Sequence, residues 1–321
     1  MKAQVKKIIP YSDFLFTPLV FISALILKFY RKLGSHRLIM TTKILKKLGV
    51  FPIVDHYYEP LFNDKLLHKP LKEKRNLPGI NLNEENQLKF LNDLNYSDEF
   101  KKFVLHEKTK SKDVRFEFGN DNFEQGDADF LFNFIRAKKP SKVIEIGCGS
   151  STKIINKALE INKKENGNFF EHICIEPFEH KWLDNFDGIK IIRQKLEELD
   201  ISIFQDLKAG DFLFIDSSHI IRPQGDVLKI YLEIIPILSK GVNIHVHDIF
   251  TPRDYLESWV VKNVKFWNEQ YLLESMLSNN KNYEIIASLN HLKNEYYNDL
   301  KRVCPFLSES NEPGSFYFRT M

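Results

Sequence analysis

Apolar and polar positions follow two patterns that alternate along most of this chain. After residue 127, seven short and nearly all-apolar runs alternate with longer segments whose apolar positions recur at helical spacing. The apolar runs are 142–146, 172–176, 189–193, 211–216, 242–246, 283–289 and 315–319; the helical segments are 127–137, 152–163, 226–238 and 256–278. Short strands that are apolar on both faces are typical of a parallel sheet covered by helices on both sides. The pattern predicts an α/β fold with a doubly wound, mainly parallel, seven-stranded sheet.

The chain before this alternating region divides into two further parts. Residues 51–125 are aromatic and mixed in character, with a helix predicted after Asn81 or Asn83, and we interpret them as a helical or irregular cap region. The stretch 65–78 is rich in Pro and Lys and is the best candidate for a linker. Residues 1–50 form an N-terminal helical extension, and residues 126–321 are the predicted cofactor-binding domain.

The N-terminal extension contains a charge-free run, residues 14–27, with basic residues on both sides. A 14-residue helix rises about 21 Å, which is short of the roughly 30 Å hydrocarbon core of a bilayer. No small-residue cleavage site follows it, which argues against a signal peptide. Two interpretations stay open: the segment dips into one membrane leaflet, or it packs on protein, either the body of this chain or a second subunit of an oligomer.

Charge is distributed unevenly along the chain. Residues 1–50 hold ten of the 46 basic residues and one of the 43 acidic residues, so the remaining body has a net charge of −6. A basic head favours contact with an anionic membrane surface, whereas a mildly acidic body argues against nucleic-acid binding. The three cysteines have no paired spacing, which excludes a disulfide framework or a zinc site and favours a reducing compartment. We expect a cytoplasmic protein at the inner face of the membrane.

Two strand ends carry the candidate cofactor site. The run at 142–146 leads into EIGCGSST, in which two glycines allow a tight turn before a helix. A dinucleotide site would prefer Gly or Ala where Thr152 stands, and the carboxylate of Glu145 suits a ligand with an ammonium group better than one with phosphates. An acid at the next strand end, Glu176, can accept hydrogen bonds from ribose hydroxyls. The candidate cofactor-binding residues are Glu145, Gly147, Cys148, Gly149, Ser150, Ser151, Glu176 and Asp216.

These motifs resemble those of class I S-adenosylmethionine-dependent methyltransferases. The resemblance covers residues 127–321, including the final run SFYFR, which is similar to the antiparallel last strand of that Rossmann-like fold. GDFLFIDSSH, VHDIF and WNEQYLL are similar, more narrowly, to bacterial members found with surface-glycan or secondary-metabolite biosynthesis. The resemblance implies S-adenosylmethionine as cofactor and a hydroxyl of a glycan or small polar metabolite as methyl acceptor.

The fourth and fifth runs end in polar residues that are candidates for catalysis. Asp216 ends one run and His219 lies three residues later, and His247 and Asp248 follow the other run. Two mechanisms stay open. Either histidine could act as general base with an aspartate orienting it, or Asp216, His247 and Asp248 could bind a divalent metal ion. Metal-dependent relatives usually have two adjacent acids after the fifth strand, and the imidazole of His247 suits softer ions than Mg²⁺.

Further residues are expected around this site. Asn122, Glu124 and Asp127 precede the first strand and are placed to close over the cofactor. Trp267 and the substrate candidates Glu269, Gln270 and Tyr271 are expected in a helix that walls the acceptor pocket. Two other functions remain open at this point: a nucleotide-dependent oxidoreductase, which Glu145 and Thr152 disfavour, and a non-catalytic cofactor-binding membrane module.

Overall fold

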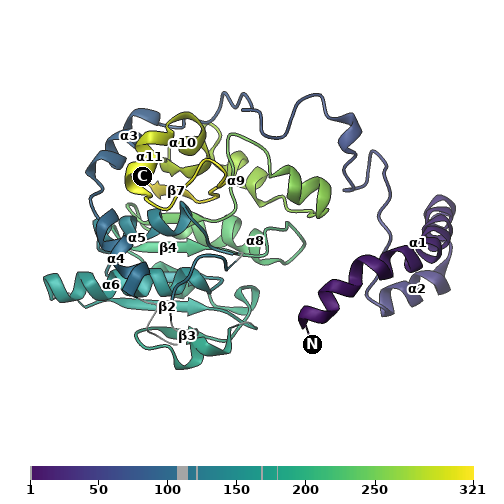
Figure 1. Cartoon of the computed structure of the whole chain (residues 1–321), viewed down its shortest axis with the longest axis horizontal. Coiled ribbons are helices and arrows are strands. Elements are labelled where there is room, and N and C mark those ends of the chain that lie inside the picture. The colour runs from purple at the N-terminus through teal and green to yellow at the C-terminus, as the bar shows by residue number, and fades with distance from the viewer. Residues whose placement is uncertain (1, 107–114, 121, 168, 179) are drawn as a thin grey trace. The chain divides into compact units, whose positions relative to one another are not determined.

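The computed structural model describes residues 2–106, 115–120, 122–167, 169–178 and 180–321 (Figure 1). The described residues fall into two compact units, one within Met1–His68 and one within Lys69–Met321. The three-part division expected from the sequence stays a prediction.

The first unit contains α1 (Lys2–Leu33), α2 (Ile39–Lys47) and the short η1 turn (Asp64–Leu66). Tyr30 and Thr42 join the two helices through a 2.6 Å hydrogen bond between their hydroxyl groups. Helix α1 extends well beyond the charge-free run that the sequence marked. Its Ser12–Leu33 portion is long and apolar enough to cross a membrane by length and composition, and no side chain of its apolar window is buried.

The second unit is built on one sheet formed by seven described strands. They are β1 (Lys142–Ile146), β2 (Glu171–Ile175), β3 (Lys190–Ile192), β4 (Phe212–Ile215), β5 (Asn243–Val246), β6 (Tyr283–Ser288) and β7 (Phe316–Thr320). Their order is β3-β2-β1-β4-β5-β7-β6, with the first five parallel and β7 antiparallel to both neighbours. The predicted α/β fold with a mainly parallel seven-stranded sheet is therefore confirmed.

Helices cover both faces of this sheet. The described helices are α3 (Glu84–Asp93), α4 (Ser97–His106), α5 (Asp127–Lys138), α6 (Ser150–Asn166), α7 (Ser202–Gln205), α8 (Asp226–Lys229), α9 (Glu269–Leu277), α10 (Leu289–Glu295) and α11 (Tyr297–Val303). Shorter turns are η3 (Lys181–Asn185), η4 (Leu196–Glu198), η5 (Ile230–Ile234), η6 (Ile235–Ile237) and η7 (Ser258–Lys262).

Strand alternation separates two hydrophobic cores. Val143 of β1 and Phe212 of β4 point into a core that includes side chains of α5 and α6, whereas Ile144 and Leu213 point into a core on the opposite face. Every one of these four side chains is fully buried. Such burial on both faces explains why the strands are continuous apolar runs in the sequence.

One segment differs from the sequence prediction. The helix expected over 256–278 is interrupted: the π-helical turn η7 is followed by irregular chain from Asn263 to Asn268, and only then does α9 begin. The reason is local, because Val264 has a φ of +51°, a left-handed conformation that ends the helical path.

Candidate active site

The order of strands places a ligand site at the carboxyl ends of β1 and β4. From β1 the chain passes to β2 and β3 on one side, and from β4 to β5 on the other, so the connections diverge at this point. A crevice outside the strand ends at such a switch point is where ligands bind in open α/β sheets. A cavity of about 520 Å³ lies here, and its lining is drawn from the ends of β1, β2, β4 and β5 and from the segment after η7.

The glycine turn after β1 forms one wall of the cavity. Gly147 has a φ of +78°, and a Cβ placed on it would lie 1.9 Å from the backbone oxygen of Asp216. This close approach is supported by the 2.8 Å hydrogen bond from the Asp216 N–H to the Ile146 carbonyl. Only glycine fits here without displacing the end of β4.

Glu176 lies directly after β2 and lines the same wall. Its carboxylate accepts hydrogen bonds from the backbone N–H groups of Phe178, at 2.9 Å, and Cys148, at 3.4 Å. The residue is only 9% exposed, so these contacts fix the carboxylate at the cavity edge. Cys148, Gly149, Ser150 and Ser151 line the cavity beside it, as the sequence analysis expected.

Glu145 is placed differently from its neighbours. Its carboxylate is fully buried beneath the glycine turn, where it accepts a 2.6 Å hydrogen bond from the Ser151 hydroxyl and lies 3.0 Å from His172 Nε2. Burial alone would lower the pKa of His172, but Cys174 and Glu145 raise it to about 10. The structure therefore does not bring Glu145 to the cavity wall; its contacts hold the start of α6 against β1 and β2.

The polar cluster at the ends of β4 and β5 forms the floor of the cavity. Asp216 follows β4, His219 lies three residues later, and His247 and Asp248 follow β5. His219 Nε2 lies 3.2 Å from Asp216 Oδ1 and 3.4 Å from Asp248 Oδ2. His247 Nδ1 lies 3.6 Å from a carboxylate oxygen of each aspartate. All four predicted catalytic residues therefore converge in one place.

His219 is the centre of this cluster. Its Nδ1 lies 2.8 Å from Glu269 Oε2, and the backbone N–H groups of Asn268 and Glu269 donate to its carbonyl oxygen. His219 and Asp248 have φ values of +59° and +60°, and left-handed backbone at a non-glycine residue is uncommon and strained. Such strain is found most often where side chains are held for function.

Electrostatics in the cluster favour charged groups. Burial alone would lower the pKa of His219, but its hydrogen bonds to Asp216 and Glu269 and the charge of Asp248 raise it to about 10. Burial alone would also lower the pKa of His247, but the charges of Asp248 and Asp216 raise it well above its usual range. Burial would raise the pKa of Asp216, but the two histidines lower it. Burial leaves the pKa of Asp248 raised despite the same histidines.

Several other residues considered from the sequence do not reach the cavity. Glu269 is fully buried behind His219, Gln270 is fully buried in hydrogen bonds to Phe250 and Arg253, and Tyr271 donates to Asp254 on the outer side of α9. A buried position behind the cluster makes Glu269 a partner of His219, not a wall of an acceptor pocket.

Asn122, Glu124 and Asp127 were expected to close over the cofactor, and only the first of them lines the cavity. Asn122 does so together with Phe123. Glu124 instead accepts from the backbone of Gly119 and Asn120. Asp127 is buried at the start of α5 and accepts from Gly314 and Ser315.

Six residues that line the cavity were not among the candidates from the sequence: Phe123, His180, Ser217, Ser218, Trp259 and Lys265. His180 lies beside Gly149 of the glycine turn, and Trp259 and Lys265 lie beside the expected Trp267. Trp259 and Trp267 stand on either side of Lys265 in the sequence, and this arrangement could have indicated a site. It was overlooked because the whole segment resembled one amphipathic helix.

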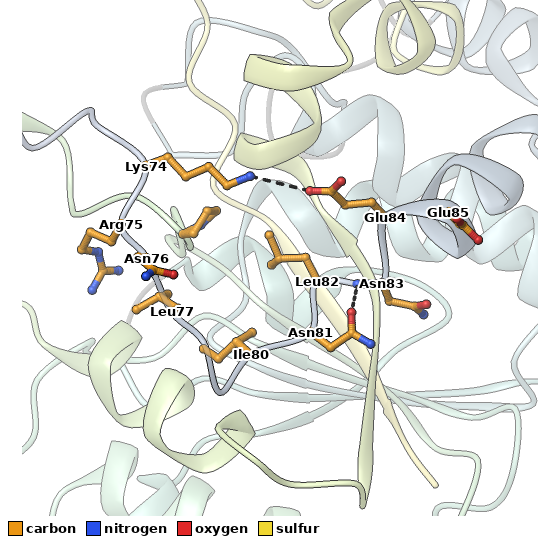
Figure 2. A pocket seen from close by; sticks show the side chains of 11 residues that line it. Lys74, Arg75, Asn76, Leu77, Ile80, Asn81, Leu82, Asn83, Glu84 and Glu85 are labelled. Carbon is orange, nitrogen blue, oxygen red and sulfur yellow. Dashed lines mark hydrogen bonds and ion pairs between the residues drawn. The ribbon is translucent and has the colours of Figure 1, made fainter.

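A second cavity, of about 550 Å³, lies in the loop before α3 (Figure 2). Lys74 and Glu84 form a 3.7 Å ion pair across it, and the Asn83 N–H donates to Asn81 Oδ1. The guanidinium of Arg75 is engaged by Glu274. Among the described residues, two groups have the spacing to hold a metal ion: Glu145, Cys148 and Cys174, and Asp216, His219 and Asp248. Neither group lines the second cavity, so we place the chemistry in the first cavity.

Comparison with known proteins agrees with this placement. Residues 144–249, which run from β1 to just beyond β5, match a family model described as a methyltransferase domain. This chain therefore contains a stretch similar to a methyltransferase domain, in agreement with the resemblance to class I S-adenosylmethionine-dependent methyltransferases. The antiparallel β7 of the sheet is the last strand that the sequence resemblance implied. The match to a methyltransferase domain favours methyl transfer over the nucleotide-dependent oxidoreductase that the sequence left open.

Individual proteins similar to this chain are distant from it in sequence. An uncharacterized protein from Archaeoglobus fulgidus is 28% identical over 192 residues, which are 56% of this chain and 83% of that protein. CalS11, a TDP-rhamnose 3'-O-methyltransferase of calicheamicin biosynthesis, is 10% identical with a TM-score of 0.36, covering 76% of this chain and 99% of its own. A methyltransferase from Anabaena variabilis is 12% identical with a TM-score of 0.29, covering 66% and 100%.

Proposed function

We propose that this methyltransferase transfers the methyl group of S-adenosylmethionine to a hydroxyl of a glycan or small polar metabolite. The observation that carries the proposal is the convergence of Asp216, His219 and Asp248 in the cavity that also contains the glycine turn. An alcohol must lose its proton during methyl transfer, and charged groups placed at the reacting atoms assist this. A cavity used only to bind a cofactor would not need such a cluster.

The glycine-turn wall fits the cofactor. Glu176 presents an ordered carboxylate that can accept from ribose hydroxyls, and the small side chains of Ser150 and Ser151 leave room beside it. S-adenosylmethionine, when bound, supplies a methyl group on a positively charged sulfur. Asp216 is the member of the polar cluster that adjoins Gly147 of this wall, and its lowered pKa keeps it negative beside that charge.

The polar cluster fits a divalent ion. The ligand atoms of Asp216, His219 and Asp248 lie within 4.8 Å of one another. Glu269 holds the Nδ1 side of His219 and directs Nε2 toward the two aspartates, which is the usual support for a metal-binding histidine. This set places His219 where the sequence suggested His247. A divalent ion bound here would act as a Lewis acid toward the acceptor hydroxyl. A ligand set with an imidazole favours Mn²⁺ or a softer ion over Mg²⁺.

The alternative without a metal changes which residue accepts the proton. Both histidines have raised pKa values, so each already carries a proton near neutral pH and is a poor base. Asp248 is then the better acceptor, because its pKa is raised and its side chain remains 15% exposed to the cavity.

We also assign α1 to attachment at the cytoplasmic face of a membrane. The support is its exposed apolar stretch together with the basic residues at its end, Arg31 and Lys32. The three cysteines of the chain are free thiols, which agrees with a reducing compartment.

The test is release of S-adenosylhomocysteine with a panel of sugars, nucleotide sugars and catechols, followed by location of the new methyl group by NMR. Asp216→Asn and Asp248→Asn should each lower turnover at least about a hundredfold. Asp206→Asn, a change at a side chain that is 71% exposed, is the matched control. Methylation of nitrogen, or full activity in both cavity variants, would contradict the proposal.

A further inference from the structure

The segment between η7 and α9 has an unusual backbone. After the π-helical turn, Val264 adopts a φ of +51°, and the Lys265 N–H donates to the Trp259 carbonyl at 2.9 Å. A left-handed conformation is rare for any residue with a side chain and is a clear outlier for a β-branched one. Because isolated π-turns and strained residues concentrate at functional sites, the residues that this turn positions are candidates for a role.

The turn places the Lys265 ammonium group against two indole rings. Its Nζ lies 3.6 Å from the centroid of the Trp267 ring and 4.3 Å from that of Trp259. The two indoles meet edge to face at 5.0 Å, and Trp267 also packs on His219 at 4.4 Å. We call Trp259, Lys265 and Trp267 the indole clamp. It adjoins the polar cluster through the contact of Trp267 with His219.

The cation in this clamp has no anionic partner in hydrogen-bonding range. Among the described residues, no hydrogen bond or ion pair involves the Lys265 side chain, and it is the single lysine or arginine that lines the cavity. An ammonium group has three N–H donors, and ring faces stabilise its charge without satisfying them. Burial lowers the pKa of Lys265, whereas the charge of Asp248 acts in the opposite direction.

We propose that the indole clamp binds an anionic group, a carboxylate or a phosphate, on the methyl acceptor. This inference rests on the proposed function and names the class of its substrate. An anionic oxygen would satisfy the free donors of Lys265 with charge-assisted hydrogen bonds. The clamp contacts His219 through Trp267, so an acceptor held there would extend its hydroxyl toward Asp216 and Asp248.

The negative floor of the cavity sets a condition on this binding. Asp216 and Asp248 would repel an acceptor anion unless a divalent ion reduces their charge. Anion affinity should therefore rise when Mn²⁺ is present. A direct bond between the anion and Mn²⁺ would give the same rise, so Lys265 variants must separate the two explanations.

The experiment uses the full chain saturated with S-adenosylhomocysteine, with and without Mn²⁺. Phenyl phosphate, benzoate and the neutral benzyl alcohol are titrated while tryptophan fluorescence is recorded. A Trp182→Phe background leaves emission from only the two clamp tryptophans, since the chain has three tryptophans. Lys265→Met removes the charge, Lys265→Arg retains it, and Lys262→Met on the exposed side of η7 is the matched control.

We expect Lys265→Met to weaken binding of at least one of the two anions by about ten- to a hundredfold. Benzyl alcohol and S-adenosylhomocysteine should bind as before, Lys265→Arg should recover most of the anion affinity, and Lys262→Met should match the parent. Whether phenyl phosphate or benzoate depends more on Lys265 identifies the anion as phosphate or carboxylate.

Other outcomes overturn the inference. If neither anion binds, or if Lys265→Met binds them as the parent does, the clamp is not an anion site and the proposed methyl transfer still stands. If benzyl alcohol loses as much affinity as the anions, Lys265 only packs the wall. If S-adenosylhomocysteine itself fails to bind, the proposed function fails and this inference fails with it.

Discussion

Replacement of Gly147 by alanine should reveal how closely the ends of β1 and β4 approach. The new Cβ would lie 1.9 Å from the Asp216 backbone oxygen, so the strand ends must separate. Gly167 is a matched control, because its φ of +69° is similar to the +78° of Gly147 but a Cβ added there would meet nothing within 4 Å. The left-handed backbone costs an alanine about 1–2 kcal/mol at either site. Separation of the ends of β1 and β4 should destabilise the Gly147 variant by a further amount of about 1–3 kcal/mol, and this cost is absent at Gly167.

Urea unfolding measures this difference. The free energy of unfolding should fall by about 1–3 kcal/mol more in Gly147→Ala than in Gly167→Ala, with equal slopes. S-adenosylhomocysteine affinity should fall only in Gly147→Ala, because the Cys148 N–H that follows the turn donates to Glu176. Equal destabilisation of the two variants, with unchanged cofactor affinity in both, would refute the reasoning from close approach.

Three further predictions concern the metal site and the two units. The folded pKa of His219, about 10, lies above the unfolded value of about 6.5, so its contribution to metal-free stability is complete below about pH 6.5 and is lost toward about pH 10; a pH-independent stability difference between wild type and His219→Gln would contradict this. Mn²⁺ should raise the Tm of wild type more than Mg²⁺ does, and should fail to raise that of Asp248→Asn; an equal Mn²⁺ shift in both proteins would exclude Asp248 as a ligand. Residues 69–321 alone should bind S-adenosylhomocysteine as the full chain does, whereas only the full chain should float with phosphatidylserine vesicles; equal flotation would exclude α1 as the anchor.

Much of the fold could be predicted because its strands are buried on both faces. The predicted run 142–146 coincides with β1, and Glu176 stands directly after β2. These strand ends bring Asp216 and Asp248 together because neighbouring parallel strands end at one edge of the sheet. The convergence of the polar cluster therefore followed from strand order, which the sequence resemblance supplied.

The direction of a side chain was harder to predict than its position. Glu145 precedes the glycine turn, but strand alternation directs it to the same face as His172 and Cys174, where it is fully buried. Helical spacing also concealed the bend at Val264, because apolar periodicity carries no information about a left-handed residue. Lys265 was missed for the same reason: in a continuous helix, a lysine at that position indicates a solvated face.

Calorimetry with S-adenosylhomocysteine on wild type, Glu176→Ala and the exposed control Glu233→Ala tests the central claim most directly. The cavity at the ends of β1, β2, β4 and β5 should bind one equivalent per chain. Loss of the ribose contacts should weaken binding by about ten- to a hundredfold in Glu176→Ala and leave Glu233→Ala unchanged. Wild-type affinity in Glu176→Ala, or binding of NADH in place of S-adenosylhomocysteine, would contradict the account.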